Sequence, residues 1–214
     1  MTEFTLTAYV VAGTASIFSA FGSQDAGIKA HVLEKAAPII ADFGGDEGRA
    51  RVADGLDRIL ASKRIEKYHW HVALATEMLF AAYGTRPEPD GAVLMRFPED
   101  YIEPVKALGL PSLAEALDVL AYSREVRIPV PIDKWDDVSG QYYFDREKVT
   151  VTFGEIEALG NVSKAIDRLY DEKPEVFGDL DADDVRHLVE SVSSMLSSAK
   201  AAGADLAVFR HGGV

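Results

Sequence analysis

The stretch Phe4-Thr-Leu-Thr-Ala-Tyr-Val-Val11, close to the N-terminus, alternates between two kinds of side chain. One side of an extended chain would carry Phe4, Leu6, Ala8 and Val10, and the other side would carry Thr5, Thr7 and Tyr9. A period of two residues is typical of a half-buried β-strand. Residues 205–210, near the C-terminus, alternate around Leu206 and Val208 in a similar way. We therefore expect the two terminal strands to pair in one small sheet.

The chain between these strands is predicted to be mostly helical, because apolar residues recur at helical spacing and capping residues stand at the segment ends. The expected helices cover residues 14–21, 23–43, 46–60, 65–83, 98–109, 111–120, 162–170 and 182–202. Pro38 is expected to kink or split the second helix, since proline lacks a backbone donor and clashes with the preceding turn. No repeat or linker divides the chain. The sequence thus predicts a single α+β domain over residues 1–214, mostly helical, with a small sheet that includes both terminal strands.

The segment from Ile65 to Tyr83 differs from the other helices because it has almost no polar face. A helix that is apolar all round is a central, buried one. Gly84 follows it as the expected C-terminal cap residue.

Three other segments are less regular. Val93–Phe97 suits a short strand or an extended chain, and the prolines in Arg127–Asp133 require an extended connector. Val149–Phe153 has the β-branched content of a strand, but the sequence around it also favours a helix. Both interpretations of that segment stay open.

The composition and motifs exclude several classes of protein and site. The absence of cysteine excludes disulfides, thiolate metal sites and cysteine nucleophiles. An acidic residue near the N-terminus and the lack of any apolar run of about 18 residues argue against an export signal and a membrane-spanning helix. We therefore expect a cytoplasmic protein without a membrane partner. The known nucleophile-elbow, dinucleotide and phosphate-loop motifs are missing as well, so no catalytic residue and no cofactor is predicted.

The net charge of −13 is unevenly distributed. Residues 99–190 contain 22 acidic and 10 basic side chains, a net charge of −12, which leaves −1 for the rest of the chain. The electrostatic field of this negative charge repels the phosphate backbones of nucleic acids. The basic residues within 49–67 do not form a basic patch, because acidic residues are interleaved with them as on a solvated helix face. We expect no nucleic-acid partner and favour a basic protein as the partner.

Glu77 is an unusual residue because it lies within the apolar stretch Leu74–Tyr83. A carboxylate buried there must pair, bind water or raise its pKa. It could act as a general acid or base in a pocket, or it could form a structural pair with a basic side chain, which is the interpretation we favour.

Two patterns resemble metal sites. Four acidic residues have the spacing of positions 1, 3, 5 and 12 of a calcium-binding loop. These residues are Asp179, Asp181, Asp183 and Glu190. Asp184 occupies the sixth position, where the loop requires glycine, so the alternative is that Asp181 caps a helix.

His69 and His71 form the second pattern. Residues two apart in a helix point to nearly opposite faces, so this pair is not expected to bind one ion if the segment is helical. In a strand the two could share an ion. We expect one imidazole to donate a hydrogen bond in the core and the other to be exposed.

Several segments together resemble a poorly characterised bacterial family, known as a domain of unknown function. They are the first strand, Gly22–Asp25, Tyr68–Gly84, Ala107–Leu110, Pro129–Asp133 and Ala204–Phe209. The C-terminal helix and strand are also similar to the uncharacterised YfbM-like small proteins. These resemblances imply a fold and no catalytic residues.

The leading functional hypothesis is a non-enzymatic binding protein, of the immunity or inhibitor type, that covers a basic partner with the acidic surface of residues 99–190. The alternative is an enzyme or small-ligand sensor with a pocket. Its lining would include Glu77, Tyr68, His69, His71, Trp135 and Tyr142. A third hypothesis is calcium binding at Asp179–Glu190.

Overall fold

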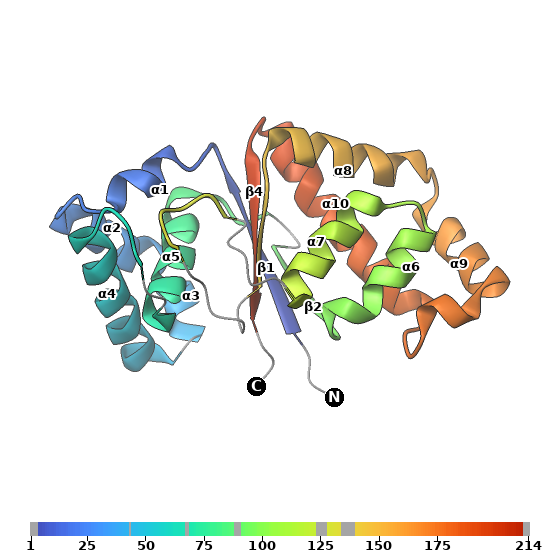
Figure 1. Cartoon of the computed structure of the whole chain (residues 1–214), viewed down its shortest axis with the longest axis horizontal. Helices are drawn as coiled ribbons and strands as arrows, with labels where there is room; N and C mark the ends of the chain where they lie inside the picture. The colour runs from blue at the N-terminus through green and yellow to red at the C-terminus, as the bar shows by residue number, and fades with distance from the viewer. Residues whose placement is uncertain are drawn as a thin grey trace.

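A β-sheet separates two layers of helices, one built from the N-terminal part of the chain and the other from the C-terminal part (Figure 1). The computed structural model describes residues 4–42, 44–66, 69–87, 91–122, 128–133 and 140–211. The first described strand begins and the last one ends at the same end of the sheet, where Thr5 pairs with His211.

The described residues form four strands in the order β2-β1-β4-β3, and every neighbouring pair is antiparallel. The strands are β1 (Phe4–Val11), β2 (Ala92–Met95), β3 (Gln141–Phe144) and β4 (Asp205–His211). β1 pairs with β4 from Thr5 opposite His211 to Val11 opposite Asp205. The predicted pairing of the two terminal strands is confirmed, and with it the α+β fold class.

Strand β1 is covered on both faces. Leu6 and Ala8 contribute to the core on one side of the sheet, whereas Tyr9 and Val11 contribute to the core on the other side. Tyr9 is only 1% exposed. The expectation of a half-buried strand was therefore wrong, because a helical layer covers the face that carries Tyr9.

In the part of the chain that the structure describes, the first layer contains five helices. They are α1 (Ala15–Ala20), α2 (Ala26–Lys35), α3 (Ala37–Asp42), α4 (Gly45–Ala61) and α5 (Trp70–Tyr83). α5 contacts α1, α2, α4 and β1, and most of its side chains are buried, as expected for a central helix. α2 and α3 are separated at Ala36, close to the predicted break at Pro38.

The second layer covers the other face of the sheet. It contains the 3₁₀ helices η1 (Pro98–Tyr101) and η2 (Pro174–Phe177) and the α-helices α6 (Ile102–Ala107), α7 (Pro111–Tyr122), α8 (Arg146–Ala158), α9 (Val162–Glu172) and α10 (Ala182–Ala201). α10 packs against β1, β2 and β4 as well as α8 and α9, and so forms the centre of this layer.

In two segments of the second half of the chain, the secondary structure differs from what the sequence pattern suggests. Val149–Phe153 is helical, because Asp145 caps α8 by accepting a hydrogen bond from the Lys148 backbone N–H at 2.9 Å. The β-branched side chains of this segment are thus accommodated on a helix. Strand β3, which the sequence did not predict, pairs with β4 at the edge of the sheet.

Candidate metal centre

Helix α5 begins at Trp70, and His69 is its N-cap residue. The backbone of His69 is extended (φ −145°, ψ 125°), and its Nδ1 accepts a hydrogen bond from the His71 backbone N–H at 3.3 Å. The two imidazole rings are therefore close, with 4.6 Å between their centroids. The prediction that they point to opposite faces of one helix was wrong, because the helix starts only after His69 and not at Ile65.

Helix α4 adds a third side chain to this pair. Asp54 lies on the face of α4 that packs against α5, and its Oδ2 is 2.6 Å from Nδ1 of His71. The neighbouring Gly55 makes the approach possible, since a Cβ atom at that position would lie 2.0 Å from the backbone oxygen of His71. Because Gly55 has no side chain, α4 packs close enough to α5 for Asp54 to reach the start of that helix.

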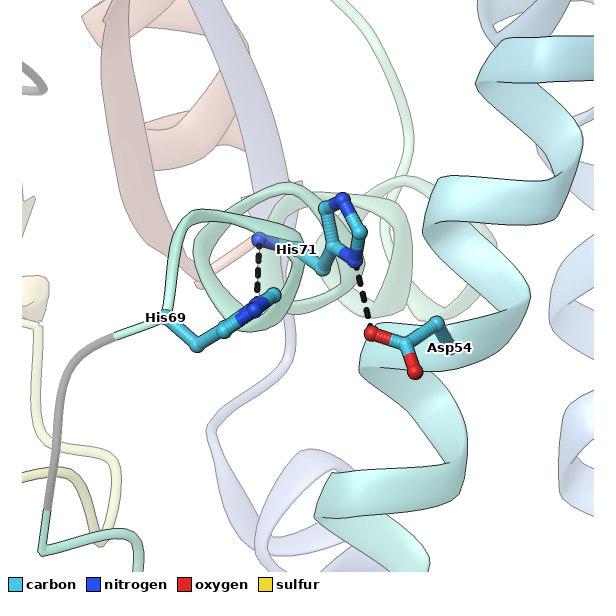
Figure 2. Close-up of side chains that lie close together, drawn as sticks. All are labelled: Asp54, His69 and His71. Atoms are coloured by element: carbon cyan, nitrogen blue, oxygen red, sulfur yellow. Dashed lines mark hydrogen bonds and ion pairs between the residues drawn. The ribbon is translucent and has the colours of Figure 1, made fainter.

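Asp54, His69 and His71 can each offer one ligand atom, and these atoms lie within 4.8 Å of one another. Figure 2 shows the three side chains converging at the start of α5, with Asp54 reaching across from α4. Among the described residues, no other group of three or more histidine or carboxylate side chains is compact enough to hold one ion. The group is half-buried, so an ion from solvent could reach it.

The electrostatic surroundings keep two of these side chains unprotonated. The hydrogen bonds from His71 and Arg58 lower the pKa of Asp54 to about 2, and the Nε of Arg58 lies 2.9 Å from Oδ2 of Asp54. Burial, followed by the charges of Arg58 and His71, lowers the pKa of His69 below its ordinary value. At neutral pH both groups are therefore in the form that binds metal ions.

The chemistry of this group is that of two imidazole nitrogens and one carboxylate oxygen. Because Nδ1 of His69 accepts the cap hydrogen bond, Nε2 is the atom of that ring that is suited to bind an ion. Ligand atoms around Zn²⁺ lie about 3.4 Å apart, given metal–ligand distances near 2.1 Å. The three ligand atoms, which lie within 4.8 Å of one another, would therefore have to move closer together to bind one ion.

Glu77 lies apart from the histidine pair and is satisfied by other residues. Its Oε1 accepts hydrogen bonds from the hydroxyl of Tyr9 at 3.1 Å and from Nε2 of His211 at 3.0 Å. The side chain of Glu77 is only 4% exposed, so solvent has almost no access to it. This arrangement agrees with the structural pair that we favoured, with His211 as the basic partner.

The predicted pocket around Glu77 and the histidines is not assembled as a unit. Tyr142 lies in the core on the other side of the sheet, where its hydroxyl accepts a hydrogen bond from Lys148 at 3.2 Å. Tyr68 and Trp135 fall outside the described residues. Among the expected lining residues that the structure describes, His69 and His71 lie side by side.

The expected calcium ligands are not gathered around a common centre. They are Asp179, Asp181, Asp183 and Glu190. Asp181 caps α10 and forms a capping box with Asp184, so the residues from Ala182 onward are helical and the twelve-residue loop is absent. Glu190 lies further along α10 and accepts a hydrogen bond from Ser163 at 3.2 Å. The alternative, in which Asp181 caps a helix, is confirmed.

The sequence does not distinguish Asp54 from the other acidic residues that are interleaved with basic ones within residues 49–67. A usable signal was the glycine beside it, since Gly55 interrupts the apolar stripe of Val52, Leu56 and Ile59. A glycine within a helix costs stability and often marks a close packing contact. The sequence does not, however, say which element makes that contact.

Comparisons with known proteins add no further assignment. No protein-family model, no curated protein and no solved structure matches the chain. Within the described residues, the helices are all too short or too polar to cross a membrane. The suspected family resemblances stay predictions.

Proposed function

We propose that this protein binds a divalent transition-metal ion, with Zn²⁺ as the best match, through Asp54, His69 and His71. The observation that carries the proposal is the convergence of three ligand atoms within 4.8 Å from two helices. Helix α4 supplies the carboxylate and the start of α5 supplies both imidazoles.

The donor atoms of the three side chains, two nitrogens and one oxygen, favour some metal ions over others. Ca²⁺ and Mg²⁺ prefer shells made of oxygen atoms, whereas imidazole nitrogens suit Zn²⁺ and its neighbours in the first transition row. Three protein ligands are also the number found in catalytic zinc sites, which keep one position for water or substrate. The site would therefore hold an ion that is still open to a further ligand.

The test is calorimetric titration of the tag-free protein with Zn²⁺ after treatment with a chelator. We expect one ion per chain, and a higher unfolding temperature in the presence of Zn²⁺. Asp54→Asn and His69→Gln should each weaken binding about tenfold or more, since even outer partners of metal ligands contribute about 10- to 100-fold to affinity.

Asp57→Asn is the matched control for these variants. Asp57 lies on the same helix as Asp54 and pairs with Lys29 at 2.6 Å, and it is not part of the ligand group. Its substitution should leave Zn²⁺ affinity unchanged. Binding that is absent from the wild type, or equally strong in His69→Gln, would refute the proposal.

We also propose that the acidic surface of residues 99–190 binds a basic protein partner. A surface hollow of about 550 Å³ between η1 and η2 is lined by the carboxylates Asp100, Glu103, Glu175 and Asp179. Burial, followed by the charges of Glu99 and Asp179, raises the pKa of Asp100 above its ordinary value. Carboxylates that repel one another in this way would be stabilised by a cationic side chain.

An oligolysine peptide is the probe for this second proposal. We expect binding that weakens as salt is added and that is reduced in the double variant Asp100→Asn/Asp179→Asn. The control is Glu34→Gln/Asp46→Asn, which removes two exposed carboxylates from the first layer. Equal loss in both double variants would show an effect of net charge alone and would contradict a defined surface.

A further inference from the structure

A cavity of about 540 Å³ adjoins the metal centre, between the end of α4 and the start of α5. Its lining includes Arg58, Ser62, Arg64, Glu66, His69 and Val72. The volume falls within the range of small-molecule sites, which is about 300–1,000 Å³. The cavity is thus large enough for a small ligand.

His69 belongs both to the ligand group and to the wall of this cavity. An ion bound to His69 would therefore lie at the edge of the cavity. A tetrahedral ion with three protein ligands has one position left for a molecule from outside. The cavity is the space next to the centre from which such a molecule could bind.

The charges around this position favour an anion. A divalent ion outweighs the single carboxylate of Asp54, and the neutral imidazoles add no charge. Arg58 adds a further positive charge, since it contacts Asp54 at 2.9 Å and also lines the cavity. The opposing carboxylates are Glu66 in the lining and Asp133, which pairs with the lining residue Arg64.

Arg64 is held in place at the cavity. Its Nε and Nη2 contact Oδ1 of Asp133 at 2.6 Å and 2.5 Å, respectively. Because Asp133 engages this edge of the guanidinium, the group still has donors on Nη1. Guanidinium groups recognise carboxylate and phosphate oxygens by charge-assisted hydrogen bonds.

We infer that the metal-loaded centre binds a small oxyanion, which takes the open coordination position from the cavity and is held there by Arg64. This inference rests on the proposed metal binding. Phosphate and carboxylate groups share the chemistry that the ion and the guanidinium recognise.

The experiment uses the protein loaded with Co²⁺ in place of Zn²⁺, because the visible absorption of Co²⁺ responds to its ligands. The loaded protein is titrated with inorganic phosphate and, separately, with acetate at constant ionic strength. We expect a saturable spectral change with at least one of them, and the tighter of the two identifies the class of oxyanion. Arg64→Gln should weaken this binding about tenfold, as for a charge-assisted hydrogen bond.

Arg168→Gln is the control, because Arg168 is an exposed residue of α9, in the layer on the other face of the sheet, and pairs there with Glu172. It should titrate like the wild type. If Co²⁺ binds and neither anion changes the spectrum, or if Arg64→Gln binds as tightly as the wild type, the oxyanion inference is wrong while the metal site stands. If Co²⁺ itself fails to bind, both proposals fall.

Discussion

At the scale of single residues, the buried Glu77 depends on two partners from distant parts of the chain. Tyr9 lies on β1 and His211 on β4, and both donate to Oε1 of Glu77. Burial, followed by the charge of Glu77, holds the pKa of Tyr9 well above its ordinary value. The phenol therefore stays protonated and remains a hydrogen-bond donor at any physiological pH.

Tyr9→Phe removes this hydroxyl and leaves the carboxylate with one donor fewer. We expect the free energy of unfolding to fall by about 1.5–3 kcal/mol, the usual range for a hydrogen bond to a charged group. Urea denaturation measures the change. Tyr122→Phe is the control, since Tyr122 is 62% exposed, and its effect should stay within about 0.5 kcal/mol. Equal effects of the two variants would mean that the contact with Glu77 contributes little.

At the scale of elements, the packing of α4 on α5 brings Asp54 close to His69 and His71. Gly55 packs directly against α5, since a Cβ atom there would lie 2.0 Å from the backbone oxygen of His71 and 2.7 Å from the Cβ of Ala75. A backbone atom cannot rotate away as the end of a flexible side chain can. Any side chain at Gly55 must therefore push the helices apart.

Gly55→Ala should destabilise the protein by about 1–3 kcal/mol, as overpacking does, and should also weaken Zn²⁺ binding because Asp54 moves away from His71. Gly154→Ala on α8 is the matched control. A Cβ atom there meets no other atom within 4 Å, and alanine favours a helix by about 0.5–1 kcal/mol over glycine, so this variant should be more stable. A Gly55→Ala protein that is as stable as the wild type and binds Zn²⁺ equally well would contradict the role of this contact.

At the scale of the whole molecule, each face of the sheet contributes side chains to a separate hydrophobic core. Phe209 of β4 packs in the first layer with Tyr9 and Phe80, whereas Leu206 and Val208 pack in the second layer. The network of Glu77 with Tyr9 and His211 joins a helix of the first layer to both terminal strands. The last strand is thus fixed to the fold by packing on two faces and by a charged contact near its end.

This contact makes stability depend on pH. Burial alone would lower the pKa of His211, but the hydrogen bond and the charge of Glu77 outweigh it, so the pKa lies above the ordinary 6.5. A raised pKa means that the folded state holds the proton more tightly than the unfolded state does. The stabilisation is therefore complete below pH 6.5 and is lost as the pH rises through the higher pKa of the folded state.

We expect the free energy of unfolding of the wild type to fall as the pH rises from 6.5 to above the pKa of His211 in the folded state. The total fall should be about 1.4 kcal/mol for each unit by which folding raises this pKa. His211→Gln should lack this part of the dependence. Urea denaturation in the presence of a chelator, compared between the two proteins across the pH range, isolates the contribution of His211 from that of the metal centre. Parallel curves for the two proteins would rule the contribution out.

The sequence alone determined the elements whose signals are local. The alternation in Phe4–Val11 specified a strand, Asp181 specified the start of α10, and the apolar segment ending at Tyr83 specified a central helix. Zero cysteines also excluded thiolate sites without any structure. These predictions succeed because periodicity and capping depend on neighbours in the chain.

Only the tertiary structure decided where the chemistry lies. His69 and His71 converge because α5 starts at Trp70, a boundary that an uninterrupted apolar pattern does not mark. Asp54 joins them because Gly55 lets α4 approach α5, and no spacing in the sequence connects that carboxylate to the histidines. The burial of both sheet faces was likewise decided by how the two helical layers pack. Contacts between distant segments are set by the packing of whole elements, and for that reason the pattern within one segment does not predict them.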